Sequence, residues 1–236
     1  MLSAASWTPR ADNEMNPPMW GTLSDMSERD ASHWVRYNGQ QSGRTVRPLL
    51  IDALDHVAAG QARVAIDIGC GAGIETQLLL ATGWTVYALD ADEHSLRQLE
   101  NTTGASAISR LNTCVVDLND LPELPLANLI YAGYALPYAR PARFYEMWNT
   151  VTRALAPGAV IAVNLFGDRD SWADREQETY MTETETHALF EGLEVLHFHV
   201  EDEDGPAFSG PKHWHVFDVI ARRPTAELDR DATSRS

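Results

Sequence analysis

Short apolar runs alternate along this chain with longer segments in which apolar residues recur at helical spacing. A short apolar run bounded by turn signals is typical of a buried strand, and the helical recurrence is typical of a helix with one buried side. The predicted strands cover residues 63–68, 85–89, 112–116, 128–132, 160–165, 193–200 and 214–221. The predicted helices cover residues 28–37, 46–58, 74–82, 93–101 and 141–155, with a last helix that ends near Phe190.

Individual residues mark where several of these helices begin or end. Asp92 is expected to cap the helix that follows it, because a carboxylate there can accept a free N–H group of the first turn. Thr182 and Glu185 have the spacing of a capping box before the last helix. Residues 157–158, Pro-Gly, are expected to end the helix 141–155 and to turn the chain into the next strand.

The order of these elements predicts the fold class. Five strand–helix units followed by a strand pair indicate an α/β fold, a doubly wound, Rossmann-like sheet of seven strands with helices on both faces. Residues 201–213 join the last two strands without a helical pattern, which favours a last strand antiparallel to an otherwise mostly parallel sheet. We expect this connection to border the ligand crevice at the carboxyl ends of the strands.

The chain divides into three parts by composition. Residues 1–26 are rich in Pro, Asn and Ser and indicate an N-terminal arm. Its Trp and Met residues would let this arm pack over the domain as a lid. The alternative is an unstructured chain end with incidental aromatic residues. Residues 27–223 form the predicted folded domain, and residues 224–236 a polar C-terminal tail.

Length and charge narrow the class of protein. The 236 residues, 44% of them hydrophobic, suit one domain with a sizeable core. We expect a cytoplasmic protein without a disulfide framework or a membrane partner, because there are two cysteines, no long apolar run and no secretory start. The formal net charge of −16 disfavours a nucleic-acid partner, since such a field repels phosphates. The sequence does not indicate an oligomeric state.

A glycine-rich turn follows the first predicted strand and carries the candidate chemistry. Gly69, Gly71 and Gly73 would let a ligand approach the backbone where a helix begins. Such a turn is shared with dinucleotide enzymes, but Ile74 replaces the last glycine of their fingerprint. The Asp67 carboxylate suits a cationic amino-acid ligand better than a pyrophosphate. An acidic residue at the end of the second strand, Asp90, can accept hydrogen bonds from ribose hydroxyls in either case.

The segment 67–73, with Asp90, Asp117 and residues 154–159, resembles the class I S-adenosylmethionine-dependent methyltransferases. Residues 134–138, 166–172 and 212–217 resemble a bacterial subgroup near the tellurite-resistance methyltransferases. The resemblance implies a methyltransferase domain over residues 27–223, with S-adenosylmethionine as cofactor. It also implies cofactor-binding residues. Those at the methionine end and the sulfur would be Asp67, Gly69, Gly71, Gly73, Tyr131 and Ala132. Those at the ribose, the adenine and a lid would be Asp90, Ala91, Asp117, Leu118 and Tyr37.

The acceptor side has weaker candidates, each with a structural alternative. His213 and His215 alternate along the last strand and share a face. The pattern fits a catalytic base, and it fits equally a pair of side chains that steady the hairpin. Asp170 is the third catalytic candidate. The predicted substrate-binding residues are Tyr134, Tyr138, Arg169 and Trp172; Arg169 would clamp an anionic acceptor or pair with its neighbours Asp168 and Asp170.

Three functions stay open from the sequence. The leading hypothesis is an S-adenosylmethionine-dependent methyltransferase that acts on a small-molecule or peptide acceptor. The alternatives are a Rossmann-fold NAD-dependent oxidoreductase and a protein that binds S-adenosylmethionine without methylating. A metal site built from His197, His199, His213 and His215 is a rival hypothesis that we do not favour, so no metal is expected.

Overall fold

The computed structural model describes residues 44–207 and 210–225, and the structural statements below concern these residues. The predicted arm 1–26, the helix 28–37 with Tyr37, and residues 226–236 of the predicted tail lie outside them. The helices are α2 (Pro48–Asp55), α3 (Ile74–Ala81), α4 (Glu93–Thr102), α5 (Pro141–Arg153) and α6 (Glu183–Leu189), with 3₁₀ turns η2 (Ile108–Arg110), η3 (Leu118–Asp120) and η4 (Leu136–Tyr138). The strands are β1 (Val64–Ile68), β2 (Thr85–Asp90), β3 (Leu111–Val115), β4 (Ala127–Ala132), β5 (Leu155–Gly167), β6 (Tyr180–Met181), β7 (Glu194–Ala207) and β8 (Gly210–Arg222).

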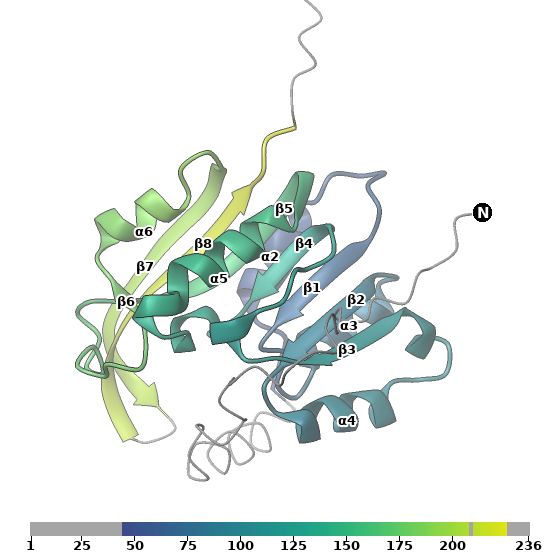
Figure 1. The fold of residues 1–236 in the computed structure, drawn as a ribbon, viewed down its shortest axis with the longest axis horizontal. Coiled ribbons are helices and arrows are strands. Elements are labelled where there is room, and N and C mark those ends of the chain that lie inside the picture. The colour runs from purple at the N-terminus through teal and green to yellow at the C-terminus, as the bar shows by residue number, and fades with distance from the viewer. Residues whose placement is uncertain (1–43, 208–209, 226–236) are drawn as a thin grey trace, which may run out of the picture.

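These strands form one sheet in the order β3-β2-β1-β4-β5-β8-β7 (Figure 1). Neighbouring strands from β3 to β5 pair in parallel, whereas β8 is antiparallel to both β5 and β7. The predicted doubly wound sheet, mostly parallel with an antiparallel last strand, is therefore confirmed. The structure adds the short strand β6, which pairs in parallel with the end of β5.

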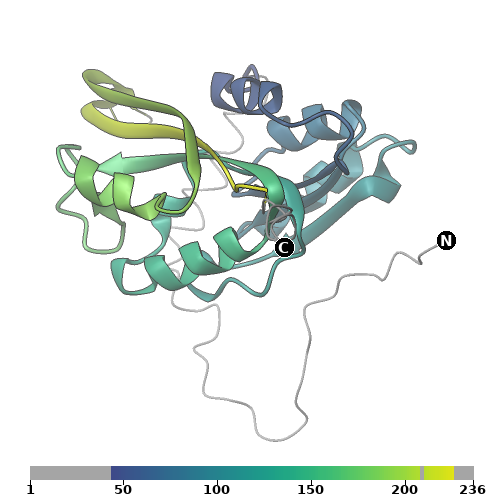
Figure 2. The same ribbon diagram turned by 90° about the horizontal axis from the view of Figure 1, so that it is seen from above.

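Helices cover both faces of the sheet, as the view from above shows (Figure 2). On one face, Leu49 and Leu50 of α2 pack with Ala65, Leu129 and Ala162 from three neighbouring strands. The other face carries the larger core cluster, in which α5 packs on the alternate residues of the same strands. This alternation follows from the two-residue period of a strand, and it explains why the parallel strands are apolar on both faces.

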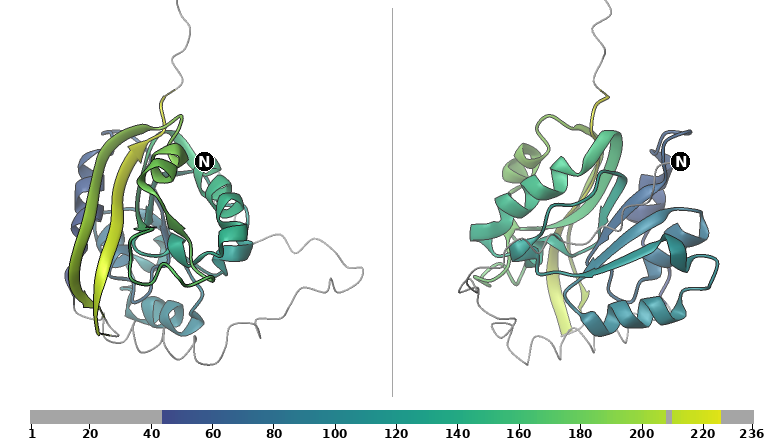
Figure 3. Two further views of the ribbon diagram at one scale, coloured as in Figure 1. Left: turned by 90° about the vertical axis from the view of Figure 1, so that its left-hand side faces the viewer. Right: turned by 45° about the vertical axis from the view of Figure 1, so that its right-hand side comes forward.

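The end of the sheet differs from the prediction. Residues 201–213, expected to be a connection, belong almost entirely to β7 and β8, whose pairing continues from Glu201↔Val216 to Ala207↔Gly210. The hairpin therefore projects past β5, whose pairing with β8 ends at Phe166↔Val216 (Figure 3). The prediction failed because this part of the ribbon has no third strand beside it. It is consequently rich in acidic residues, without the apolar alternation of a packed strand.

Some predicted helix boundaries agree with the structure, and others differ by a few residues. Asp92 caps α4 by accepting the N–H of His94 at 3.0 Å, and Thr182 and Glu185 form the predicted capping box. The helix predicted over 46–58 begins at Pro48, because proline fits the first turn of a helix, and it ends at Asp55. Helix α5 ends at Arg153, so that residues 157–158 lie within an irregular stretch of β5 rather than at the helix end.

Candidate functional site

The glycine turn between β1 and α3 has the backbone that its sequence requires. Gly69, Gly71 and Gly73 have φ values of 72°, 49° and 76°, a left-handed region that favours glycine. A Cβ atom on Gly69 would lie 2.4 Å from the Cβ of Ala135, and one on Gly73 would lie 2.5 Å from Cδ1 of Leu99. Two of the three glycines are thus required by the turn itself and by its packing, apart from any approach of a ligand.

Asp90, at the end of β2, holds the glycine turn in place. Its carboxylate accepts the backbone N–H of Gly71 at 2.7 Å and that of Asp92 at 2.9 Å. Burial raises the pKa of Asp90 above its ordinary value, although these hydrogen bonds oppose the shift. Each carboxylate oxygen can accept more than one hydrogen bond, so the side chain retains capacity for a ribose hydroxyl. Ala91 follows it on the surface.

Asp67 is buried beneath the same turn. Its side chain accepts a 2.6 Å hydrogen bond from Oγ1 of Thr76, and burial raises its pKa to about 7. Glu75 nearby differs, because the Arg44 guanidinium and the Arg47 N–H donate to its carboxylate. Burial alone would raise the pKa of Glu75, but these donors hold it below its ordinary value. Asp67 therefore differs from Glu75 in having no cationic hydrogen-bond partner within the described chain.

Tyr131 lies beside Asp67 in the sheet. The two residues are register partners in β4 and β1, so their side chains share a face. The Tyr131 hydroxyl is buried and, within residues 44–207 and 210–225, accepts or donates no hydrogen bond. It lies under Gly133, where an added Cβ would be 2.4 Å from it. Burial raises the pKa of Tyr131, so the phenol stays protonated and can donate to a ligand. The next residue, Ala132, is buried.

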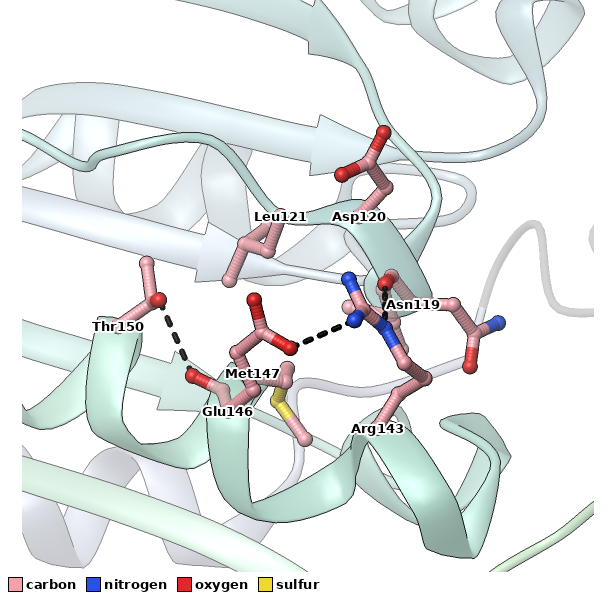
Figure 4. A pocket seen from close by; sticks show the side chains of 8 residues that line it. Asn119, Asp120, Leu121, Arg143, Glu146, Met147 and Thr150 are labelled. Atoms are coloured by element: carbon pink, nitrogen blue, oxygen red, sulfur yellow. Dashed lines mark hydrogen bonds and ion pairs between the residues drawn. The ribbon is translucent and has the colours of Figure 1, made fainter. Parts of the chain in front are cut away.

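The predicted adenine neighbours lie after β3. Asp117 is exposed and caps η3 by accepting the N–H of Asn119 at 2.8 Å. Leu118 lines a small cavity between η3 and α5, together with Asn119, Asp120, Leu121, Arg143, Glu146, Met147 and Thr150 (Figure 4). The cavity measures about 20 Å³, room for about one water molecule and far too little for a nucleoside.

The structure brings three of the predicted substrate-binding residues into one aromatic cluster. The ring of Tyr134 lies 6.3 Å from that of Trp214 and 6.4 Å from that of Phe166. Tyr138 packs edge-on against Phe166 at 5.7 Å, and Trp172 lies 6.1 Å from Trp214. Tyr134 follows β4 with a φ of 56°, rare for a residue with a side chain. Our sequence reasoning did not single out Phe166 or Trp214 as site residues.

Sequence reasoning also missed the charged group of this cluster, Lys212. Its ammonium lies 2.6 Å from Oδ1 of Asp170 and 3.8 Å from the ring centroids of both Trp172 and Trp214. The side chains of Lys212 and Asp170 are 2% and 0% exposed. One signal could have revealed it, because Lys212 is the single lysine in a chain whose other basic residues are all arginine.

His213 and His215 share a face of β8, as predicted, but each is held by the protein. Both ring nitrogens of His213 lie within 3 Å of carboxylates, those of Asp202 and Asp204, whose contacts raise its pKa. His215 is fully buried, and its Nδ1 accepts the N–H of Arg169 at 3.0 Å. Burial lowers the pKa of His215, so the ring is neutral with its proton on Nε2. Their catalytic role stays a prediction, and these contacts favour the alternative that both steady the hairpin.

Arg169 pairs with neither of its sequence neighbours. Its guanidinium lies 2.7 Å from Oδ2 of Asp202 on β7, because β5 and the hairpin lie side by side. Asp170, the third catalytic candidate, turns inward to Lys212 and accepts the N–H of Trp172 and of His215. The alternative in which Arg169 pairs with its flanking aspartates is therefore wrong, since its partner comes from another strand.

The histidines do not gather into a metal site. His213 and His215 share one face of the hairpin, whereas His197 and His199 lie on the other, as the strand register requires. Across the described residues, no cluster of three or more His, Cys, Asp or Glu side chains is placed to hold a metal ion. None of the helices in these ranges is long and apolar enough to cross a membrane.

Residues 65–158, which contain the glycine turn, Asp90 and Tyr131, match the family described as a methyltransferase domain. Together with the fold, this match confirms the predicted class, the class I S-adenosylmethionine-dependent methyltransferases. The matched segment is thus a methyltransferase domain, which supports an enzyme that uses S-adenosylmethionine as its cofactor. The alternative of an NAD-dependent oxidoreductase gains no support from the match. No curated protein sequence matches the chain.

Solved structures share the fold at low sequence identity. TehB from Haemophilus influenzae has a TM-score of 0.65 at 17% identity, over 80% of this chain and 67% of that chain. The 1,6-didemethyltoxoflavin-N1-methyltransferase of Burkholderia thailandensis has a TM-score of 0.61 at 18% identity, over 82% and 87%. The N-methyltransferase NodS from Bradyrhizobium japonicum WM9 has a TM-score of 0.60 at 16% identity, over 82% and 98%. Identities this low show a common fold and leave the acceptor open.

Proposed function

We propose that this enzyme transfers a methyl group from S-adenosylmethionine to a small-molecule acceptor held against the aromatic cluster of Tyr134, Phe166, Trp172 and Trp214. The observation that carries the proposal is the glycine turn, braced by Asp90 at 2.7 Å and lying over the buried Asp67. When bound, the cofactor supplies an electrophilic methyl carbon on a sulfonium. The main task of the protein is then to hold the acceptor atom in line with that carbon.

The methionine end of the cofactor fits the residues around Asp67. A ligand ammonium would compensate the buried carboxylate, which has no cationic hydrogen-bond partner in the described chain. The Tyr131 hydroxyl lacks a partner there too, and a ligand oxygen beside Gly133 would satisfy it. We assign Gly69, Gly71, Gly73 and Ala132 to the walls of this end of the site.

The nucleoside end is assigned to the residues that follow β2 and β3. Asp90, with Ala91 beside it, would hold the ribose through the free lone pairs of its carboxylate. Asp117 and Leu118 would flank the adenine. Tyr37, the predicted lid, lies outside the described residues and stays a prediction from the sequence.

The acceptor side favours a small, flat molecule over a peptide. Aromatic rings supply large, rigid surfaces for stacking, and four of them form a chain of contacts from Phe166 through Tyr134 and Trp214 to Trp172, with centroids 6.1–6.4 Å apart. The Burkholderia thailandensis enzyme with the same fold is bound to a small molecule, 1,6-didemethyltoxoflavin. The histidines are engaged in hydrogen bonds, which suits an acceptor that needs no general base.

Calorimetric titration with S-adenosylhomocysteine tests the cofactor site. Wild-type protein is expected to bind it, and Asp90→Ala is expected to bind at least tenfold more weakly, because a hydrogen bond to a charged group contributes about 1.5–3 kcal/mol. Asp52→Ala, on the exposed side of α2, is the matched control and should bind like the wild type.

Two outcomes would contradict the proposal. Wild-type protein that releases no heat with millimolar S-adenosylhomocysteine has no such site. Bound cofactor without transfer of a labelled methyl group to any small-molecule pool would instead leave the non-methylating alternative standing.

A further inference from the structure

Lys212 is the one position where this chain uses an ammonium instead of a guanidinium. It lies on β8 with its side chain only 2% exposed, whereas lysine is almost never buried without a partner. The two cations are not interchangeable, because the ammonium is a compact point charge and the guanidinium a broad planar fork. A compact cation is what the corner between Asp170, Trp172 and Trp214 accommodates.

The backbone also holds Asp170, the partner of this charge. A buried ion pair is on average no more stabilising than apolar side chains of similar volume. Asp170, moreover, already accepts the backbone N–H groups of Trp172 at 3.0 Å and of His215 at 3.3 Å. The carboxylate is therefore held by the backbone on either side of it as well as by Lys212.

The ammonium also retains capacity for a ligand. It has three N–H donors, and its described polar contact is one oxygen of Asp170. Its other described neighbours are ring faces, those of Trp172, Trp214 and, at 5.6 Å, Phe166. Ring faces attract a cation more weakly than an anion does, so an anionic group entering beside the indoles would bind the ammonium more strongly.

Two further cations lie against the rings of this cluster. The Arg47 guanidinium lies 4.5 Å from the Tyr134 ring, and that of Arg175 lies 3.9 Å from the Trp172 ring. Three cations and two carboxylates thus lie at the aromatic cluster, since Lys212 pairs with Asp170 and Arg175 with Glu178, in a chain whose net charge is −16. An anion repelled by most of the surface would be attracted here.

We propose that Lys212 is a specificity-determining residue of the acceptor site, where its ammonium between Trp172 and Trp214 selects planar aromatic acceptors that carry an anionic group. The indoles supply stacking surface, and the ammonium supplies the charge that distinguishes an aromatic acid from its neutral analogue. This inference rests on the proposed function and adds the chemical class of the acceptor to it.

Two probes of matched shape and different charge test the inference: 2-naphthoate and 2-naphthamide. Both are titrated by calorimetry into the full chain saturated with S-adenosylhomocysteine. Wild-type protein is expected to bind the naphthoate at least tenfold more tightly. Lys212→Met, which keeps length without charge, should bind the two probes within twofold of each other. Arg97→Met, which removes an exposed cation from α4, should keep the wild-type preference.

A second measurement needs no variant. Protein labelled with ¹³C at the ε carbon of lysine gives one lysine signal in the spectrum, because the chain has one lysine. Naphthoate is expected to shift this signal, and naphthamide to leave it in place.

The inference is overturned if neither probe binds at millimolar concentration, if wild-type protein binds both equally, or if Lys212→Met keeps the preference. Failure of S-adenosylhomocysteine to bind would count against the proposed function itself. Normal binding of S-adenosylhomocysteine without probe selectivity would count against the role of Lys212 alone.

Discussion

Replacing Asp67 by asparagine is expected to stabilise the free enzyme at alkaline pH and to weaken its hold on the methyl donor. Asp67 is buried, and its pKa is raised from 3.8 to about 7 because burial penalises the charged form. Asparagine removes that charge, and its amide oxygen can still accept the hydrogen bond from Thr76. The same change removes the carboxylate that we assign to the ammonium of the cofactor.

The magnitude follows from the protons that each state binds. Between pH 3.8 and about 7 the native state keeps a proton on Asp67 that the unfolded state has released, so the free energy of unfolding falls as pH rises through this window. About 1.4 kcal/mol for each pH unit gives about 4 kcal/mol over the whole window. About 3 kcal/mol of this is lost between pH 5 and pH 8 in the wild type and is absent in the variant.

Urea unfolding at pH 5 and pH 8 measures this difference. The free energy of unfolding of Asp67→Asn should exceed that of the wild type by about 3 kcal/mol more at pH 8 than at pH 5. The affinity of the variant for S-adenosylhomocysteine should fall. Asp52→Asn on the surface of α2 is the control and should track the wild type at both pH values. A variant no more stable than the wild type at pH 8, or with the same advantage at both pH values, would refute the reasoning.

Two further predictions concern the turn and the hairpin. Gly69→Ala should destabilise the protein by about 2–5 kcal/mol in thermal unfolding, because it adds overpacking against Ala135 to the strain of a left-handed backbone. The control is Gly60→Ala, with φ 84° and open space around it, which should cost only the backbone strain of about 1–2 kcal/mol. Equal losses of stability in the two variants would contradict the packing argument. His213→Gln should loosen the projecting hairpin, measured as faster amide exchange in residues 201–207. The pKa of His213 is raised by its carboxylate contacts, so these contacts stabilise the hairpin at low pH and are lost as the ring deprotonates. The difference from the wild type should therefore disappear at high pH, and unchanged exchange at pH 6 would rule out this role.

The periodic core of the fold was predictable because each strand and helix carries its own pattern. The parallel strands β1 to β5 are short apolar runs, separated by α-helices except between β3 and β4, where only η3 lies. The structure places each strand within a few residues of its prediction, β5 with an earlier start. The projecting half of the hairpin was missed for the converse reason. Residues 201–207 are mostly polar, and their strand conformation depends on pairing with β8 alone, a long-range contact that no local pattern encodes.

The cofactor side of the site was likewise predictable from local sequence, and the acceptor side was not. The turn from Asp67 to Gly73 and the position of Asp90 were predictable from the sequence, since the turn conformation requires glycine locally and the strand ends fix the acidic residues at one edge. Three contacts of the acceptor side were not predictable in this way: Lys212 with Asp170, Arg169 with Asp202, and Trp214 with Tyr134. These partners are tens of residues apart and come together because β8 inserts antiparallel between β5 and β7. Local backbone chemistry thus fixed the donor side, and the sheet order assembled the acceptor side.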